Sequence, residues 1–208
     1  MLRKNPKTRI AVFVSGGGTN LQALIDAERA GKIRNGKIEL VLSSNPEAYA
    51  LERAKNADIP AVTVSRKAHP EDFEAKIIES LDAYSIDLIV LAGFLSILSE
   101  DFTRRYHRRI LNVHPSLIPS FCGKGFYGLR VHEAALERGV RLTGATVHFV
   151  NEIPDGGEII MQKAVAVRDG DDAKTLQRRV MEEAEWKILP ASVEKVSADM
   201  RRLGATAR

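Results

Sequence analysis

The chain of 208 residues has little of several features that mark special classes of protein. Its single cysteine, Cys122, excludes an internal disulfide and a metal site built from several cysteines. No apolar run approaches the roughly 20 residues that a membrane helix needs, and the basic start at residues 1–7 lacks the apolar core of a signal peptide. No histidine pair has metal-site spacing, so we expect chemistry without a metal. A cytoplasmic protein without a membrane partner is therefore expected.

Aromatic residues are also scarce, with seven Phe, four Tyr and one Trp, and the formal net charge is +4. Because the basic residues are scattered and form no stripe with aromatic side chains, we expect no nucleic-acid partner. The positive charge fits an anionic small molecule, such as a phosphate or a carboxylate. What the chain does have is 44% hydrophobic and 28% charged residues, which is ordinary for a globular protein with a real core.

Segments with strand and helix patterns alternate along the chain. Strands are expected at residues 9–14, 37–43, 61–64, 88–92, 110–114, 142–150 and 158–166. Helices are expected at residues 20–30, 48–57, 70–84, 99–106, from about 131, and 173–188. Pro70 is predicted at the first position of its helix. This alternation predicts the α/β class, with a mostly parallel twisted sheet and helices on both faces. We expect one domain over 1–208, with a core of about 9–190 and a polar, frayed C-terminal tail.

Asn112 and His114 end one of these strands, before the turn that begins at Pro115. Side chains alternate along a strand, so the two point the same way. Two hydrogen-bond donors aimed at one spot are what a tetrahedral oxyanion needs. For an isolated Asn-x-His, a capping amide and a surface histidine would be the better interpretation; the remaining motifs favour the catalytic one.

The run Ser15-Gly16-Gly17-Gly18-Thr19-Asn20 lies between the first strand and the first helix. Glycines and a helix N-terminus suit a phosphate, and the alternative is a turn in which Thr19 and Asn20 cap the helix. A dinucleotide fingerprint is incomplete, because Leu21 stands where a third glycine belongs and residues 43–45 lack an acid. A monophosphate, such as a phosphoribosyl group, is therefore the favoured ligand.

Asp155 stands in a tight turn before two glycines, where an aspartate is common for structural reasons. A carboxylate beside an imidazole would orient the ring and raise its pKa, so we expect Asp155 to contact a protonated His114. His148 is interpreted as a hydrogen-bonded residue within its strand, and His132 as packing or capping at the start of its helix.

Taken together, these segments resemble the phosphoribosylglycinamide formyltransferase family. The resemblance covers about residues 9–190 and rests on five motifs: Ser15–Asn20, Leu91-Ala92-Gly93-Phe94-Leu95, Asn112–Pro119, Thr146-Val147-His148-Phe149 and Asp155-Gly156-Gly157. It implies a Rossmann-like core that transfers the formyl group of 10-formyltetrahydrofolate, as co-substrate, to the amine of glycinamide ribonucleotide in purine biosynthesis. The implied enzyme is a monomer or a homodimer without a metal.

The same resemblance implies roles for individual residues. Asn112, His114 and Asp155 match the catalytic trio. Gly18, Thr19 and Asn20 would bind the substrate phosphate, and Glu185 would help to bind the ribonucleotide. The implied folate-binding residues are Leu95, Ser96, Ile97, Leu98, Asn112, Asn151, Glu152, Ile153, Pro154 and Asp155.

Three features depart from the family's pattern. Ser96 stands where many relatives have a basic residue, and Trp186 where many have a histidine. The segment from Arg179 to Pro190 is one residue longer. None of these changes touches the predicted catalytic trio.

Two other functions are weighed against ribonucleotide formylation. A formyltetrahydrofolate hydrolase, or another formyltransferase such as the methionyl-tRNA enzyme, would share the trio. Those relatives resemble this core with an added domain, whereas here the first strand begins near Arg9 and the sequence stops at Arg208. A non-enzymatic sensor of a phosphate ligand would need only the glycine loop, so the joint presence of the trio argues against it.

Overall fold

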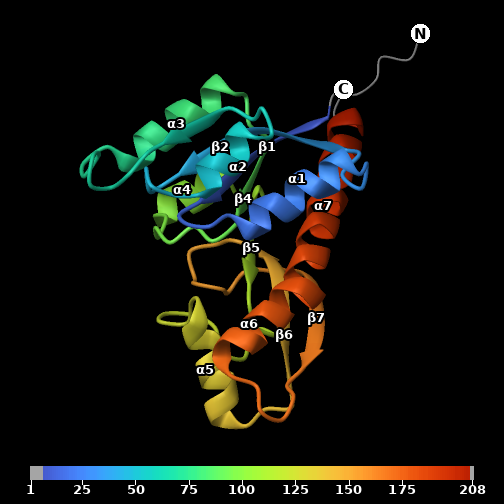
Figure 1. The fold of residues 1–208 in the computed structure, drawn as a ribbon. Helices are drawn as coiled ribbons and strands as arrows, with labels where there is room; N and C mark the ends of the chain where they lie inside the picture. Colours follow the sequence, from blue (N-terminus) through green and yellow to red (C-terminus); the bar gives the residue numbers. More distant parts are fainter. Residues whose placement is uncertain (1–6, 207–208) are drawn as a thin grey trace. The chain divides into compact units, whose positions relative to one another are not determined.

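The computed structural model describes residues 7–206; the basic start at 1–6 and the last two residues lie outside this part of the chain. It consists of two compact units, one comprising Met1–Leu98 with Val193–Arg208 and the other Ser99–Ser192 (Figure 1). The described residues contain seven strands, and helices alternate with most of them. The predicted α/β class is confirmed, while the single domain over 1–208 stays a prediction.

The first unit contains four parallel strands in the order β3-β2-β1-β4. They are β1 (Thr8–Val14), β2 (Gly36–Ser43), β3 (Ala61–Thr63) and β4 (Leu88–Leu91). Residues 10–14 of the central strand β1 are fully buried, as expected for a parallel strand that is covered on both faces.

Three helices connect these strands: α1 (Thr19–Arg29), α2 (Ala50–Lys55) and α3 (Phe73–Ala83). The chain steps from β1 to β2 to β3 in one direction and then crosses back to β4. Since crossover connections are right-handed, this reversal places α1 and α2 on one face of the strands and α3 on the other. The reversal also leaves the carboxyl ends of β1 and β4 side by side, which is where α/β folds bind ligands.

The start of α3 differs from the prediction that Pro70 opens the helix. Asp72 is the N-cap and Phe73 the first helical residue. The backbone N–H groups of Ala68 and His69 instead donate to the carbonyl of Ser65, which closes a separate turn before the helix. The predicted apolar stripe of Phe73, Ile77 and Leu81 is buried, as expected.

The second unit is built on three antiparallel strands in the order β5-β6-β7. These strands are β5 (Ile110–His114), β6 (Leu142–Phe149) and β7 (Ile159–Ala166). The helical segments are α4 (Glu100–Arg105), α5 (Leu129–Arg138), α6 (Ala173–Val180) and a π-helix, η1 (Met181–Glu185). In the register of β5 and β6, Asn112 lies opposite His148 and His114 opposite Thr146.

The prediction of a frayed C-terminal tail is wrong, because residues Trp186–Thr206 form the helix α7. Val193 and Val196 are buried at helical spacing. The carboxylate of Glu194 accepts hydrogen bonds from the backbone N–H groups of Arg34 and Asn35, at 2.8 and 2.9 Å. These tertiary contacts therefore stabilise as a helix a segment that the sequence analysis predicts to be a polar tail.

Candidate active site

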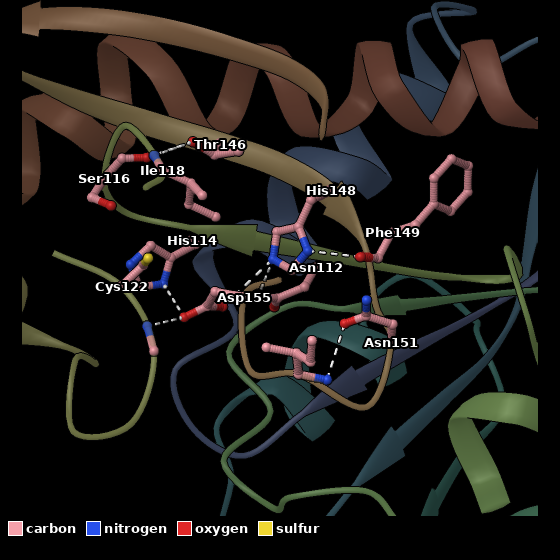
Figure 2. A network of polar contacts seen from close by, with 12 residues as sticks. Asn112, His114, Ser116, Ile118, Cys122, Thr146, His148, Phe149, Asn151 and Asp155 are labelled. Atoms are coloured by element: carbon pink, nitrogen blue, oxygen red, sulfur yellow. Dashed lines mark hydrogen bonds and ion pairs between the residues drawn. The ribbon is translucent and has the colours of Figure 1, made fainter. Parts of the chain in front are cut away.

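Strand β5 presents Asn112 and His114 on one face, as the two-residue spacing predicts (Figure 2). The neighbouring strand β6 places His148 and Thr146 opposite them. His114 is buried and Asn112 is half-buried. Antiparallel pairing thus gathers four polar side chains on one small area of the second unit.

Asp155 reaches both histidines of this cluster. Its Oδ2 lies 3.5 Å from Nδ1 of His114, and its Oδ1 lies 3.5 Å from Nε2 of His148. The backbone N–H of Gly123 donates a hydrogen bond of 2.8 Å to Oδ2. The predicted contact between Asp155 and His114, across about 40 residues of sequence, is confirmed.

The two glycines after Asp155 allow this turn to close. A Cβ on Gly157 would lie 1.7 Å from the carbonyl oxygen of Phe149, and one on Gly156 would lie 2.6 Å from Cγ2 of Ile153. Asp155 itself has φ 56°, a left-handed conformation that aspartate tolerates better than most residues. The Asp-Gly-Gly sequence is therefore required by the backbone path that delivers the carboxylate.

The protonation of His114 differs from the prediction. Its Nε2 lies 2.8 Å from the carbonyl oxygen of Phe121 and donates to it, which leaves Nδ1 facing Asp155. Burial lowers the pKa of His114 by more than the charge of Asp155 and the Phe121 carbonyl raise it. The pKa of His114 is therefore lowered overall and not raised as expected, and Nδ1 is the nitrogen that can take a proton.

The pKa of the Asp155 carboxyl group is lowered overall, so this group stays ionised near neutral pH. Burial raises its pKa, but the contact with His148, the hydrogen bond from the Gly123 amide and the positive charge of His114 or His148 when either is protonated lower it overall. The site therefore contains an ionised carboxylate beside a neutral imidazole near pH 7. A proton gained by Nδ1 of His114 would be stabilised by this carboxylate.

His148 does more than the sequence analysis expected. It is hydrogen-bonded within the strand, as predicted, because its Nδ1 donates to the carbonyl of Phe149 at 2.8 Å. That bond leaves Nε2 as an acceptor for the amide nitrogen Nδ2 of Asn112, at 3.2 Å. In the sequence, only the place of His148 in an expected strand could have indicated its contact with Asn112, because the pairing of that strand with β5 is a tertiary feature.

The loop after Pro119 also contacts the cluster, through the Phe121 carbonyl and the Gly123 amide. No pattern in the sequence indicated these backbone groups. Cys122 lies between them, and its thiol donates to the carbonyl of Pro119 at 3.3 Å. Burial and the charge of Asp155 raise the pKa of this thiol, so Cys122 is not an activated nucleophile.

In the first unit, the glycine loop has the features of an anion site. Gly18, with φ 71°, is the N-cap residue of α1 and has no side chain that could cap the helix, whereas Thr19 and Asn20 are its first helical residues. The carbonyls of Gly16 and Gly17 are turned toward the protein, where they accept from the N–H of Ala50 and from Nε of Arg53. The first turn of α1 also contains no acidic residue, so this helix N-terminus suits an anion.

The two predicted folate segments expose apolar side chains. In the first unit, Leu95 is 70% and Ile97 is 79% exposed, and the backbone N–H of Leu95 donates to Oγ of Ser15 at 2.9 Å. The carbonyl of Ile97 accepts from the Arg66 guanidinium at 2.6 Å. In the second unit, Ile153 is 58% exposed in the turn that also contains Asn151, Glu152 and Pro154. Such surfaces suit a flat, partly apolar ligand.

Glu185 is buried at the end of the π-helix, whereas Glu182 is exposed. A π-helical turn holds one residue more than an α-helical turn. The π-helix lies within the segment from Arg179 to Pro190 that we expect to be one residue longer, and Glu185 is the glutamate that is directed into the protein.

Within residues 7–206, no helix is long and apolar enough to cross a membrane. In the same part of the chain, no group of three or more His, Cys, Asp or Glu side chains is arranged to bind a metal ion.

Comparisons with known proteins agree with this geometry. Residues 8–193 match the formyl transferase family model. The chain is 43% identical over 200 residues to the human trifunctional purine biosynthetic protein adenosine-3, covering 95% of this chain but only 19% of that protein. It is 41% identical over 197 residues to phosphoribosylglycinamide formyltransferase of Haemophilus influenzae, covering 94% of this chain and 90% of the relative.

Solved structures are similar over nearly the whole chain. Glycinamide ribonucleotide transformylase 1 from Symbiobacterium toebii has a TM-score of 0.88 at 39% identity, covering 96% of this chain and 92% of the relative. A formyltetrahydrofolate deformylase from Pseudomonas syringae has a TM-score of 0.78 at 27% identity, covering 91% of this chain and 62% of the relative. These matches and the cluster around Asp155 lead to one conclusion: the chain belongs to the formyl transferase family.

Proposed function

We propose that this chain transfers the formyl group of 10-formyltetrahydrofolate to the amine of glycinamide ribonucleotide, in purine biosynthesis. The observation that carries the proposal is the cluster of Asn112, His114 and Asp155 in the second unit. The name of the Haemophilus relative, of which the chain covers 90%, supports the ribonucleotide as formyl acceptor. We further propose a cytoplasmic enzyme that acts on small molecules as a monomer or a homodimer.

The chemistry follows from the state of these three side chains. As the substrate amine attacks the formyl carbon, the carbonyl oxygen becomes negative and accepts a hydrogen bond from the Asn112 amide. Nδ1 of neutral His114 takes the proton that the amine loses, and the resulting imidazolium is stabilised by the Asp155 carboxylate. The same proton then passes to N10 of the folate as the bond from N10 to the formyl carbon breaks. One proton leaves the amine and one reaches N10, so the transfer balances.

The other proposed contacts are made by residues with suitable chemistry. Gly18, Thr19 and Asn20 would donate backbone and side-chain hydrogen bonds to the phosphate, at the N-terminus of α1. Glu185 would accept hydrogen bonds from the ribonucleotide. The exposed apolar side chains at 95–98, and those in the turn 151–154, would contact the folate.

Hydrolysis of the formyl group by water is the second candidate, because the deformylase structure shares the fold. A deformylase has no need of a phosphate site. The glycine loop of the first unit, at a helix N-terminus without acidic residues in its first turn, therefore favours transfer to a phosphorylated acceptor over transfer to water.

The test is release of tetrahydrofolate from 10-formyltetrahydrofolate, measured with and without glycinamide ribonucleotide, with His114→Ala as the inactive control. We expect turnover that depends on the ribonucleotide and forms formylated product in equal amount. Turnover with water alone would assign the chain as a hydrolase. Tight binding of the ribonucleotide without turnover in any mixture would assign it as a sensor.

A further inference from the structure

Thr146 lies on β6, directly opposite His114, and is fully buried. Its hydroxyl group donates to the carbonyl of Ser116 at 2.7 Å and accepts from the backbone N–H of Ile118 at 3.1 Å. It also accepts from Nε2 of Gln162, on β7, at 3.0 Å. One hydroxyl thus uses its donor and both acceptor sites, and two of the three bonds end on the turn after Pro115 (Figure 2).

The turn anchored in this way is cross-linked further. Nε2 of Gln162 donates to the carbonyl of Ile118 at 3.0 Å, and Oγ of Ser116 donates to the carbonyl of Ser120 at 2.5 Å. A Cβ on Gly144, two residues before Thr146, would lie 2.9 Å from Leu117. The face of β6 that carries Gly144 and Thr146 therefore serves as the support on which the turn at residues 116–120 rests.

The residues directly after this turn hold two members of the proposed catalytic trio. The carbonyl of Phe121 accepts from His114 at 2.8 Å, and the amide of Gly123 donates to Asp155 at 2.8 Å. Phe121 has φ 49°, an uncommon conformation for a residue other than glycine, which persists only where the surrounding structure imposes it. Residues 121–123 belong to no helix or strand, so their position depends on the anchored turn before them.

We propose that Thr146 is a positioning residue for formyl transfer. By fixing the turn at residues 116–120, it sets the Phe121 carbonyl against His114 and the Gly123 amide against Asp155. Gln162 supports Thr146 through its two bonds. The expected change in kcat rests on the proposed function, whereas the expected change in the positions of His114 and Asp155 does not.

The central comparison is Thr146→Val against Thr146→Ser. Valine has nearly the same shape but lacks the hydroxyl, whereas serine retains it. We expect Thr146→Val to lower kcat by about 10–100-fold, because small displacements of reacting groups have effects of this size. KM for both substrates should stay within about threefold, since the described hydrogen bonds of Thr146 end on the turn and on Gln162. Thr146→Ser should retain most of kcat, and Gln162→Ala should give an intermediate loss.

A spectroscopic measurement separates positioning from simple support of the fold. In Thr146→Val, amide exchange at Gly123 should accelerate at least about tenfold, and the slowly exchanging Nε2 proton of His114 should be lost from the NMR spectrum. Both should remain in Thr146→Ser. The same changes, in reduced form, should be seen in Gln162→Ala, where an exposed side chain is altered and folding is not at risk.

Three outcomes would overturn the proposal: equal kcat for the valine and serine variants, a lower melting temperature with unchanged kcat, or unchanged Gly123 and His114 signals. If the wild-type chain showed no formyl transfer, the proposed function would fail. The NMR comparison would still decide whether Thr146 sets the positions of His114 and Asp155.

Discussion

The two units build their candidate sites from different parts of the polypeptide. In the first unit, the anion site consists of backbone groups: the N-terminal amides of α1, with the carbonyls of Gly16 and Gly17 turned away. In the second unit, cross-strand pairing places side chains opposite one another, Asn112 with His148 and His114 with Thr146, and a turn adds Asp155. Parallel strands bring loops together at their carboxyl ends, whereas antiparallel strands bring side chains into register. Since the strand pairing differs, we expect changes to the backbone to damage the first site most and changes to side chains to damage the second site most.

The electrostatics of the two sites differ in the same way. The first turn of α1 contains no acidic residue, so the helix N-terminus stays attractive to an anion. The second unit instead places a half-buried, ionised carboxylate, Asp155, between the imidazoles of His114 and His148. The first site is suited to binding charge and the second to moving a proton.

The largest expected effect comes from Asp155→Asn, which removes the charge from the second site but retains its shape. We expect kcat to fall by about 10²–10⁴-fold, the usual contribution of a proton-transfer group. Since the carboxylate raises the pKa of His114, that pKa should fall further below its ordinary value. NMR titration of His114 and steady-state kinetics measure both changes, and ribonucleotide affinity should survive.

The matched control is Asp169→Asn, an exposed aspartate of the same unit that pairs with Arg141. It should leave both kcat and the His114 titration unchanged. Identical titration of His114 in the wild type and in Asp155→Asn would break the proposed pair and reduce Asp155 to a turn residue.

The second prediction concerns the pH dependence of stability that a buried histidine of the second unit causes. His132 on α5 is fully buried, and no described residue forms a hydrogen bond with either of its ring nitrogens. Burial, and to a smaller extent the charge of His114, lowers the pKa of His132 to about 4. Between pH 6.5 and 4, His132 is mostly protonated in the unfolded chain but mostly neutral in the folded chain. The free energy of unfolding should therefore fall by about 3 kcal/mol from this group between pH 6.5 and 4, and not above pH 6.5.

His132→Leu should remove this pH dependence. Denaturation by urea at pH 7 and at pH 4.5 measures it, with the exposed His107→Gln as control. Parallel loss of stability in the wild type and His132→Leu would show that the acid sensitivity arises elsewhere.

The third effect concerns the first unit alone. A Cβ at Gly18 would lie 2.7 Å from Cβ of Ala50, on a backbone with φ 71°. Gly18→Val should therefore displace the loop and weaken binding of the ribonucleotide, and inhibition by inorganic phosphate, by about tenfold or more, the effect of losing one charge-assisted hydrogen bond. Affinity for the folate and kcat at saturation should be retained.

Gly31→Val is the control for backbone strain, because Gly31 has φ 68° but open space around it. It should leave both affinities unchanged. Equal weakening of ribonucleotide and folate binding by Gly18→Val would show that the loop supports the fold and is not a phosphate site.

The smallest effect is expected at Ser96, where the family resemblance implies a basic residue. Ser96→Arg should tighten binding of a glutamylated folate about twofold to fivefold at low salt, the usual range for exposed charge pairs. The gain should fade at high salt as ions screen the charges. Ser96→Gln, long but uncharged, is the control, and an equal gain from Gln would assign the effect to contact area.

Much of this architecture was predictable from local patterns. The apolar runs of β1 and β4 predicted buried strands, and the stripe of Phe73, Ile77 and Leu81 predicted α3. The two-residue spacing of Asn112 and His114 predicted a shared face. The C-terminal helix was not predicted, because its order depends on contacts such as those of Glu194 with Arg34 and Asn35, which are distant in the sequence.

The sequence by itself determined the types of the strands and helices, the glycine loop, and the identity of Asn112, His114 and Asp155 as candidates. These follow from short-range periodicity and from the chemistry of the side chains. Only the tertiary structure decided that Asp155 reaches His114, that His148 and the Phe121 carbonyl contact the trio, and that burial lowers the pKa of His114. Proximity across the chain and the degree of burial set these properties, and neither is encoded in any local stretch of residues.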